Sequence, residues 1–187
     1  MTLDLERELR ERGALLEGHF RLSSGRHSDR FIQKFRILED PQLVEPLARR
    51  IADAFREMRP TVVLSAAVGG IVLGYEVARA LGVKAIFAEK EAGAAVLRRG
   101  FELTPADRVL VVEDVITTGG SVQEIVQIAR ASGAEIAGVG AIVRRGEAEF
   151  SVPTVALLEM PIVSYDEVAC PQCRAGVPIA DPGSRRS

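Results

Sequence analysis

The chain has 187 residues, of which 47% are hydrophobic and 27% charged, and its formal net charge is −2. This composition is typical of a single globular domain and excludes a disordered chain, while the small net charge indicates neither a nucleic-acid nor a membrane-surface partner. The charged N-terminus lacks the apolar core of a signal peptide. The longest uncharged run, residues 60–75, is shorter than the roughly 20 residues of a membrane-spanning helix. We therefore expect a cytoplasmic protein that binds neither nucleic acid nor membrane.

The first predicted elements precede residue 60. A helix is expected from about Leu3 to Arg12, with Gly13 ending it. Between Ala14 and Ile37 the loose alternation of apolar and polar residues around SSGRHS predicts a hairpin, or a strand with a turn. Asp40 and Pro41 then predict a helix start, because Asp caps the first turn and Pro is tolerated within it.

After residue 60, short β-branched runs alternate with helical patterns. This alternation predicts a doubly wound α/β fold with a parallel sheet. Ser121 and Glu124 have the spacing of a capping box at the start of one helix, and residues 180–187 show no regular pattern. Strands are expected at residues 61–66, 84–88, 107–114, 135–143 and 154–160, and helices at residues 68–82 and 120–131.

The segment VLVVEDVITTGGSV, residues 109–122, is the most informative part of the chain. An apolar strand runs into the adjacent carboxylates Glu113 and Asp114, and a turn rich in glycine and hydroxyl groups leads into a helix. Ligands bind beyond the carboxyl ends of strands in open parallel sheets, and backbone N–H groups at a helix N-terminus bind anions. We therefore predict a phosphate cradle formed by Thr117, Thr118, Gly119, Gly120 and Ser121.

Two carboxylates beside a phosphate site need a partner other than phosphate. A phosphorylated ribose supplies sugar hydroxyls, a bound divalent metal, and a carbon that becomes cationic when its leaving group departs. The competing interpretation is that Glu113 and Asp114 only end a strand and cap a turn. A Walker loop is excluded because no Gly-Lys-Ser/Thr is present, and a dinucleotide fingerprint is excluded because Gly119-Gly120 lacks the third glycine.

The same segment closely resembles the phosphoribosyl pyrophosphate (PRPP) motif of type I phosphoribosyltransferases. Other segments are similar to the orotate phosphoribosyltransferase family: GHFRLSSGRHSDRFI to its hood, SAAVGGIVLG to its pyrophosphate loop, GAIVRRGEA to its base-binding strand end, and CPQCRAGVPIADPGSR to the tail of one bacterial subgroup. The resemblance implies one phosphoribosyltransferase domain, a parallel sheet flanked by helices with a small N-terminal hood. Its expected parts are a hood at 1–40, an α/β core at 41–160 and a tail at 161–187.

The resemblance implies transfer of ribose 5-phosphate from PRPP to orotate, giving orotidine 5′-monophosphate and pyrophosphate in pyrimidine biosynthesis. Mg²⁺ would be the cofactor, bound mainly through PRPP and without direct protein ligands. Glu113 and Asp114 would be catalytic and hold the ribose hydroxyls, directly or through the metal. PRPP would contact Val115, Ile116, Thr117, Thr118, Gly119, Gly120 and Ser121 as well as the two acids.

For the base, the resemblance implies contacts from Thr117, Arg145, Phe31 and Ile32. An arginine suits a planar anionic base, although a one-residue shift of the alignment would exchange Arg145 for Arg144. Family members are homodimers in which a mobile loop reaches into the partner's site, so a homodimer is also expected.

The expected mobile loop, residues 89–101, departs from the family pattern. Lys90 keeps the position of a catalytic, PRPP-binding lysine, but Glu89 stands where arginine is usual and no histidine is present. Arg98 and Arg99 are its other cations, and Gly69 stands where the pyrophosphate loop often has lysine. Pyrophosphate must then be stabilised by fewer cations, or more heavily by magnesium.

Two other functions stay open. One is a phosphoribosyltransferase for a different base. The other is a PRPP-sensing regulator of the same fold, which the depleted loop favours, although the chain lacks a basic stretch for binding nucleic acid.

Cys170 and Cys173 have the spacing of a metal knuckle. A structural zinc ion requires four ligands, and we expect neither a second cysteine pair nor a nearby histidine to complete the site. We therefore expect two cysteines in a C-terminal turn without zinc. A zinc ion shared across a dimer is the alternative.

Overall fold

The computed structural model describes residues 4–22 and 24–182. The chain forms two units: the hood unit, which is the chain up to Ile37 together with the part from Pro161 onward, and the core unit, Leu38–Met160. The segments expected to form the hood and the tail therefore belong largely to the same unit. Within the described ranges, every helix is too short or too polar to cross a bilayer.

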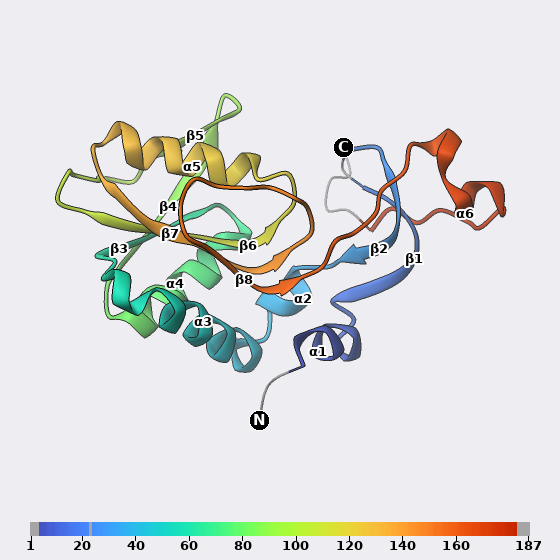
Figure 1. Ribbon diagram of the computed structural model, residues 1–187, viewed down its shortest axis with the longest axis horizontal. Coiled ribbons are helices and arrows are strands. Elements are labelled where there is room, and N and C mark those ends of the chain that lie inside the picture. The colour runs from blue at the N-terminus through green and yellow to red at the C-terminus, as the bar shows by residue number, and fades with distance from the viewer. Residues whose placement is uncertain (1–3, 23, 183–187) are drawn as a thin grey trace. The chain divides into compact units, whose positions relative to one another are not determined.

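The core unit contains a six-stranded sheet with the order β5-β4-β3-β6-β7-β8 (Figure 1). All neighbouring pairs are parallel except the edge pair β4 and β5. The predicted α/β class with a parallel sheet is confirmed. The strands are β3 (Val62–Ala66), β4 (Lys84–Glu91), β5 (Ala94–Leu97), β6 (Arg108–Ile116), β7 (Glu135–Arg144) and β8 (Thr154–Glu159).

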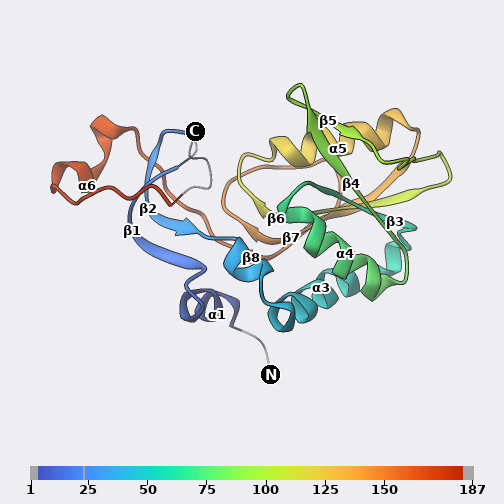
Figure 2. The same cartoon turned by 180° about the vertical axis from the view of Figure 1, so that it is seen from behind.

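Helices cover both faces of this sheet, α3 and α4 on one face and α5 on the other (Figures 1 and 2). The strands bury β-branched and aliphatic side chains on both faces, which accounts for their nearly continuous apolar runs. Helix α3 lies so close to β7 that a Cβ on Gly138 would come within 2.3 Å of the Phe55 ring. The helices are α3 (Pro41–Phe55), α4 (Gly69–Leu81) and α5 (Gly120–Ala131), and the 3₁₀ turn η1 spans Arg56–Met58.

The ends of these helices follow local rules. The Asp40 side chain accepts a hydrogen bond of 2.9 Å from the Gln42 N–H, as predicted for a cap at the start of α3. Gly82, with φ of 74°, ends α4. The predicted capping box at α5 is wrong: the cap residue is Gly119, no side chain caps this helix, and Glu124 binds Lys90 instead.

The segment expected to be a mobile loop begins as a hairpin. Strand β4 continues to Glu91, beyond the predicted end at residue 88, and pairs with β5. The two turn residues, Ala92 and Gly93, have positive φ values of 48° and 89°. Such a turn matches the right-handed twist of the flanking strands, so it closes a tight two-residue hairpin.

The hood unit is built on an antiparallel hairpin of β1 and β2, as the sequence predicts for residues 14–37. The C-terminal segment joins both strands of this hairpin near its turn: Tyr165 pairs with His27, and Ala180 pairs with Phe20. The predicted irregular stretch 180–187 therefore starts with a strand-like contact, and residues 183–187 lie outside the described ranges. The elements are α1 (Leu5–Glu11), β1 (Leu15–Arg21), β2 (His27–Ile32), η2 (Glu167–Ala169) and α6 (Pro171–Arg174), with α2 (Phe35–Leu38) at the junction with the core unit.

Candidate active site

The acid pair lies where the direction of the sheet connections reverses. Strand β3 pairs with β6 only as far as Ser65 opposite Val112, whereas β6 continues along β7 to Ile116. Glu113 and Asp114 therefore lie beyond the last residue pair of β3 and β6. The helices that follow β3 and β6 cover opposite faces, which makes this edge the topological switch point where open α/β sheets bind ligands.

Both carboxylates are held in place by backbone N–H groups. Glu113 and Asp114 are only 7% and 2% exposed. The Asp114 N–H donates to Glu113 Oε1 at 3.1 Å, and the Val115 N–H donates to Asp114 Oδ1 at 2.7 Å. Because each bond joins a carboxylate to the N–H of the next residue, the two carboxylates are held in a fixed orientation at the end of the strand.

A helix N-terminus meets the acid pair from the neighbouring strand. Helix α4 begins with Gly69 and Gly70, and a Cβ on Gly70 would lie 3.6 Å from Glu113 Oε1 and 3.2 Å from Ser65 Cβ. The glycine therefore allows the first turn of α4 to approach the carboxylate. The loop expected to serve pyrophosphate thus places the positive end of a helix dipole beside the acids.

The predicted phosphate cradle forms the turn between β6 and α5. Within the described residues, the backbone N–H groups of Thr117, Thr118 and Gly119 donate no hydrogen bond. Both threonines are exposed, and the turn leads directly into the first turn of α5. Available N–H donors at a helix N-terminus are the arrangement that binds phosphate.

Two glycines fix the shape of this turn. Gly119 has φ of 80°, and a Cβ there would lie 2.9 Å from Ala148 Cβ and 3.0 Å from the Phe150 ring. A Cβ on Gly146 would lie 2.6 Å from the Thr117 carbonyl oxygen. Gly146 is not among the residues predicted from the sequence, although a glycine directly after the arginine pair is a visible sign of close backbone approach.

The two candidate base-binding arginines have different surroundings. Arg144 donates to Glu159 Oε2 at 2.8 Å, and this bond raises its pKa. Arg145 joins the cradle through its backbone, whose N–H donates to the Ile116 carbonyl at 2.8 Å. Its buried Nε has no hydrogen-bond partner among the described residues, and burial lowers its pKa. A desolvated guanidinium of this kind is ready to bind an anion.

The Lys90 side chain already has partners within the chain. Its ammonium is paired with Glu124 on α5 and donates to the Gly93 carbonyl at 3.3 Å. The Lys90 bond is the main cause of a lowered Glu124 pKa. The role predicted for Lys90 at pyrophosphate therefore requires this pair to open.

The other cations of the hairpin are also paired. Arg99 forms two 2.9 Å bonds with Glu89, and Arg98 donates to Glu91 at 2.9 Å. The Arg99 bond lowers the Glu89 pKa. The acid that replaces the expected arginine thus binds a neighbouring arginine, and both residues are partly exposed.

Phe31 and Ile32 lie at the end of β2 in the hood unit. Phe31 is half-buried and its ring lies 5.8 Å from that of Phe20, while Ile32 is buried opposite Leu15. Their predicted contact with the base stays a prediction.

The chain matches known proteins over most of its length. Residues 36–158 match the family model described as phosphoribosyl transferase domain. Orotate phosphoribosyltransferases of Pelotomaculum thermopropionicum and Caldanaerobacter subterraneus are 51% and 48% identical to it, over 93% and 91% of this chain and 93% and 90% of theirs.

A solved structure shares the fold. The crystal structure of orotate phosphoribosyltransferase from Aeropyrum pernix superposes with a TM-score of 0.71 at 27% identity, covering 83% of this chain and 93% of that one. The strand order, the acid pair at the switch point and the cradle agree with this relationship. The chain therefore belongs to the phosphoribosyl transferase domain family and, within it, to the orotate phosphoribosyltransferases.

Proposed function

We propose that this protein transfers ribose 5-phosphate from PRPP to orotate, releasing pyrophosphate. The observation that carries the proposal is the half-buried Arg145 side chain, whose buried Nε has no hydrogen-bond partner among the described residues and whose backbone joins the strand end that bears the acid pair and the predicted phosphate cradle. One site thus combines donors for a phosphate, acceptors for sugar hydroxyls and a cation for an anionic base. The curated relatives named above are orotate phosphoribosyltransferases.

In the proposed reaction, each group of the protein acts on a different part of the two substrates. N–H groups of residues 117–119 bind the 5′-phosphate, and the Thr117, Thr118 and Ser121 hydroxyls add donors. As the C1′–O bond breaks, its electron pair leaves with pyrophosphate, and C1′ becomes cationic near Glu113 and Asp114. A ring nitrogen of orotate, whose N–H proton is lost to water, then forms the new bond to C1′, while Arg145 holds the base. Carboxylates fixed beforehand at a developing positive charge lower the barrier without reorganising.

Magnesium belongs to the proposal as the cofactor, and when bound it would supply positive charge to neutralise the leaving pyrophosphate. Oxygen donors suit Mg²⁺, which keeps several waters and is commonly bound through substrate phosphates together with one or two carboxylates. Glu113 and Asp114 fit this chemistry, because they supply carboxylate oxygens next to one another at the end of β6. They would hold the ion together with PRPP, directly or through water.

The alternative, a protein that binds PRPP as a signal, is not favoured, because the curated relatives named above are orotate phosphoribosyltransferases. The feature that raises it is the pairing of Lys90, Arg98 and Arg99 with acids of the chain. An absorbance assay of orotate loss distinguishes the two, run with PRPP and Mg²⁺ and repeated with uracil, adenine and hypoxanthine. Of these four bases, we expect only orotate to be turned over. PRPP binding without turnover of any base would support the sensor, and turnover of another base would replace orotate.

We also propose a homodimer. Val68, Val72 and Tyr75 form an apolar stripe around the start of α4, with exposed fractions of 72%, 44% and 63%. Their spacing places them along one side of the helix, as expected for a surface that a second copy covers. Light scattering after gel filtration should give twice the chain mass, and Tyr75→Glu should shift it toward the monomer.

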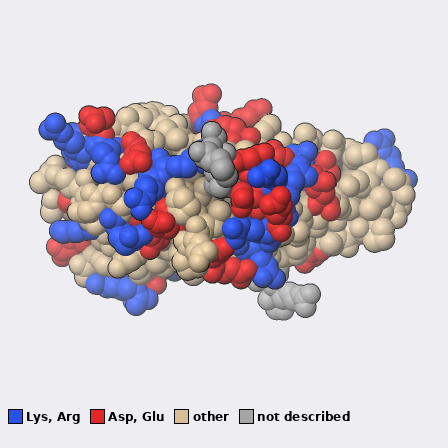
Figure 3. Space-filling model, turned by 90° about the horizontal axis from the view of Figure 1, so that it is seen from below, with Lys and Arg blue, Asp and Glu red and all other residues tan. Residues whose placement is uncertain are grey.

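We also propose that the enzyme is cytoplasmic and does not bind nucleic acid. On the face shown in Figure 3, acidic and basic side chains are interspersed. On α3 and α4 they form ion pairs such as Glu45–Arg49 and Glu76–Arg79, so the basic groups are locally neutralised. Cell fractionation and a DNA-binding assay test these points.

A further inference from the structure

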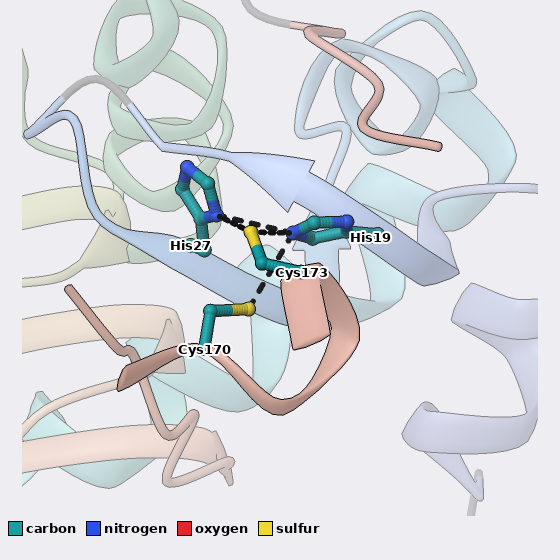
Figure 4. Close-up of side chains that lie close together, drawn as sticks. All are labelled: His19, His27, Cys170 and Cys173. Atoms are coloured by element: carbon teal, nitrogen blue, oxygen red, sulfur yellow. Dashed lines mark hydrogen bonds between the residues drawn. The ribbon is translucent and has the colours of Figure 1, made fainter. Parts of the chain in front are cut away.

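Four metal-ligand side chains meet in the hood unit, and none of them is among the residues assigned to the reaction. His19 lies on β1 and His27 is the first residue of β2. Cys170 directly precedes α6, and Cys173 lies within it (Figure 4). Three of the four residues are buried and Cys173 is half-buried. We call this group the His–Cys cluster. The expectation that no histidine is near the cysteine pair is therefore wrong, because the fold brings two histidines to it.

The distances within the His–Cys cluster fit a tetrahedral zinc ion. His19 Nε2 lies 3.1 Å from His27 Nδ1, 3.5 Å from Cys170 Sγ and 3.6 Å from Cys173 Sγ. His27 Nδ1 lies 3.2 Å from Cys173 Sγ, and all four ligand atoms are within 4.8 Å of one another. Zn–S bonds of about 2.3 Å and Zn–N bonds of about 2.0–2.1 Å at tetrahedral angles separate ligand atoms by roughly 3.3–3.8 Å.

The hydrogen bonds of His19 point to a cation at the centre. Its Nδ1 lies 2.8 Å from the Val177 carbonyl oxygen, which can only accept, so Nδ1 carries the proton. Nε2 of the neutral ring then has one lone pair, yet three potential donors crowd around it. One metal ion bound to all four atoms satisfies them together. A carbonyl that orients the opposite ring nitrogen is the usual outer partner of a zinc-bound histidine.

The charge of such a site suits its burial. Binding of Zn²⁺ releases one proton from each thiol, so two thiolates, two neutral imidazoles and the ion form a group without net charge. A neutral group costs far less to bury than an isolated cation. Neither cysteine is in a disulfide, so both sulfurs are available as ligands.

The location also gives the site a structural task. The hood unit has a two-stranded sheet, and isolated two-stranded hairpins are marginally stable in water. The His–Cys cluster joins both strands to a distant C-terminal segment. Cys173 and His19, for example, are 154 positions apart in the sequence. Small units with little core are commonly stabilised by a structural metal.

We propose that the protein binds one structural Zn²⁺ ion through His19 Nε2, His27 Nδ1, Cys170 Sγ and Cys173 Sγ. The ion fastens the C-terminal segment to the β1–β2 hairpin. The proposal is independent of the reaction, because none of the four residues is assigned to PRPP or orotate.

Metal analysis of the purified full-length protein tests the site. Protein expressed with zinc and dialysed against a weak chelator should retain one zinc ion per chain. A mercurial thiol reagent should release it, with the two cysteines modified as the metal appears. Cobalt in place of zinc should give the intense visible bands and the sulfur charge-transfer band of tetrahedral thiolate ligation. Protein that retains no zinc, or whose cysteines are joined in a disulfide, overturns the proposal.

Variants separate ligation from loosening of the tail. Cys173→Ser removes a half-buried ligand with little change of shape and should lose zinc almost completely. Gln172→Ala is the matched control, because its side chain donates to the Gly18 carbonyl at 2.8 Å and holds the same segment without being a ligand. It should retain zinc. Equal loss in both variants overturns the proposal, and the cobalt spectrum of the wild-type protein remains decisive if a variant fails to fold.

Discussion

The phosphate cradle and the His–Cys cluster are built in opposite ways. The cradle is one continuous segment, and its donors are backbone N–H groups set by a buried strand on one side and a helix on the other. The cluster is formed by side chains from a two-stranded hairpin and from the distant C-terminal segment. Backbone donors persist through most side-chain substitutions, whereas a site made of side chains is lost with any one of them. We therefore expect changes around the cradle to affect catalysis first, and changes at the cluster to affect stability first.

Removal of zinc should give the largest effect and should act on the fold. A ligand present at about 1,000 times its Kd stabilises the folded state by about 4 kcal/mol, which corresponds to a Tm shift of about 10 °C in a chain of this size. A strong chelator should lower the Tm by about this amount, and added zinc should restore it. Differential scanning calorimetry measures the shift.

The same experiment can contradict the structural role of the His–Cys cluster. Chelated protein that unfolds at the Tm of the zinc-bound form would remove the structural role from the cluster. Cys173→Ser should unfold at the chelated Tm and show no further decrease when the chelator is added.

Asp114→Asn should have the largest effect on the reaction. The substitution keeps the shape of a side chain that is 2% exposed but removes its charge where C1′ becomes cationic. We expect kcat/KM to fall by roughly 10²-fold, or about 3 kcal/mol, with little change in Tm. The orotate absorbance assay and a thermal unfolding curve measure the two quantities. Turnover at the wild-type rate would exclude the proposed ribose site.

Arg145→Ala should have a smaller and more selective effect. An unpaired buried charge costs about 2–5 kcal/mol, and because Arg145 is half-exposed we expect the lower end, a roughly 30-fold loss in kcat/KM through the orotate KM. PRPP binding measured without base should change little. Kinetics at varied orotate concentration and calorimetry of PRPP binding separate the two terms.

Arg144→Ala is the matched control, because its guanidinium is already paired with Glu159. Its orotate KM should stay near the wild-type value. A damaging Arg144→Ala beside a silent Arg145→Ala would show that the register of base recognition is shifted by one residue.

The sequence predicted the strand, turn and helix around residues 109–131 well because every feature of this segment is local, while phosphate binding by the turn stays a prediction. An apolar run, two acids and a glycine turn stand next to one another, and the bounds predicted for α5, Gly120 to Ala131, are those of the structure. The Asp40 cap succeeded for the same reason. The His–Cys cluster could not be found this way, because sequence spacing carries no information on which strand will face a distant cysteine pair.

The β4–β5 hairpin shows a second limit, competition between local and distant partners. Ser121 and Glu124 have capping-box spacing, but Lys90 on another strand binds Glu124. The Ala92-Gly93 turn lacks the Asn-Gly or Asp-Gly signature of a tight hairpin, so its closure was not predicted. The loop cations therefore have partners that the sequence does not reveal.

Lys90→Ala should give the smallest effect, because exposed ion pairs contribute about 1 kcal/mol or less to stability. The Lys90–Glu124 pair is roughly half exposed, so the Tm should hardly change. If Lys90 leaves Glu124 to bind pyrophosphate, its loss should raise the KM for PRPP about 10-fold, or 1.4 kcal/mol, with the orotate KM unchanged. Glu124→Gln is the matched variant: it frees the ammonium from its partner and should leave the PRPP KM equal or lower. A PRPP KM that rises in Glu124→Gln and stays constant in Lys90→Ala would show that the pair only fastens the hairpin to α5, and that pyrophosphate is held by magnesium and backbone donors.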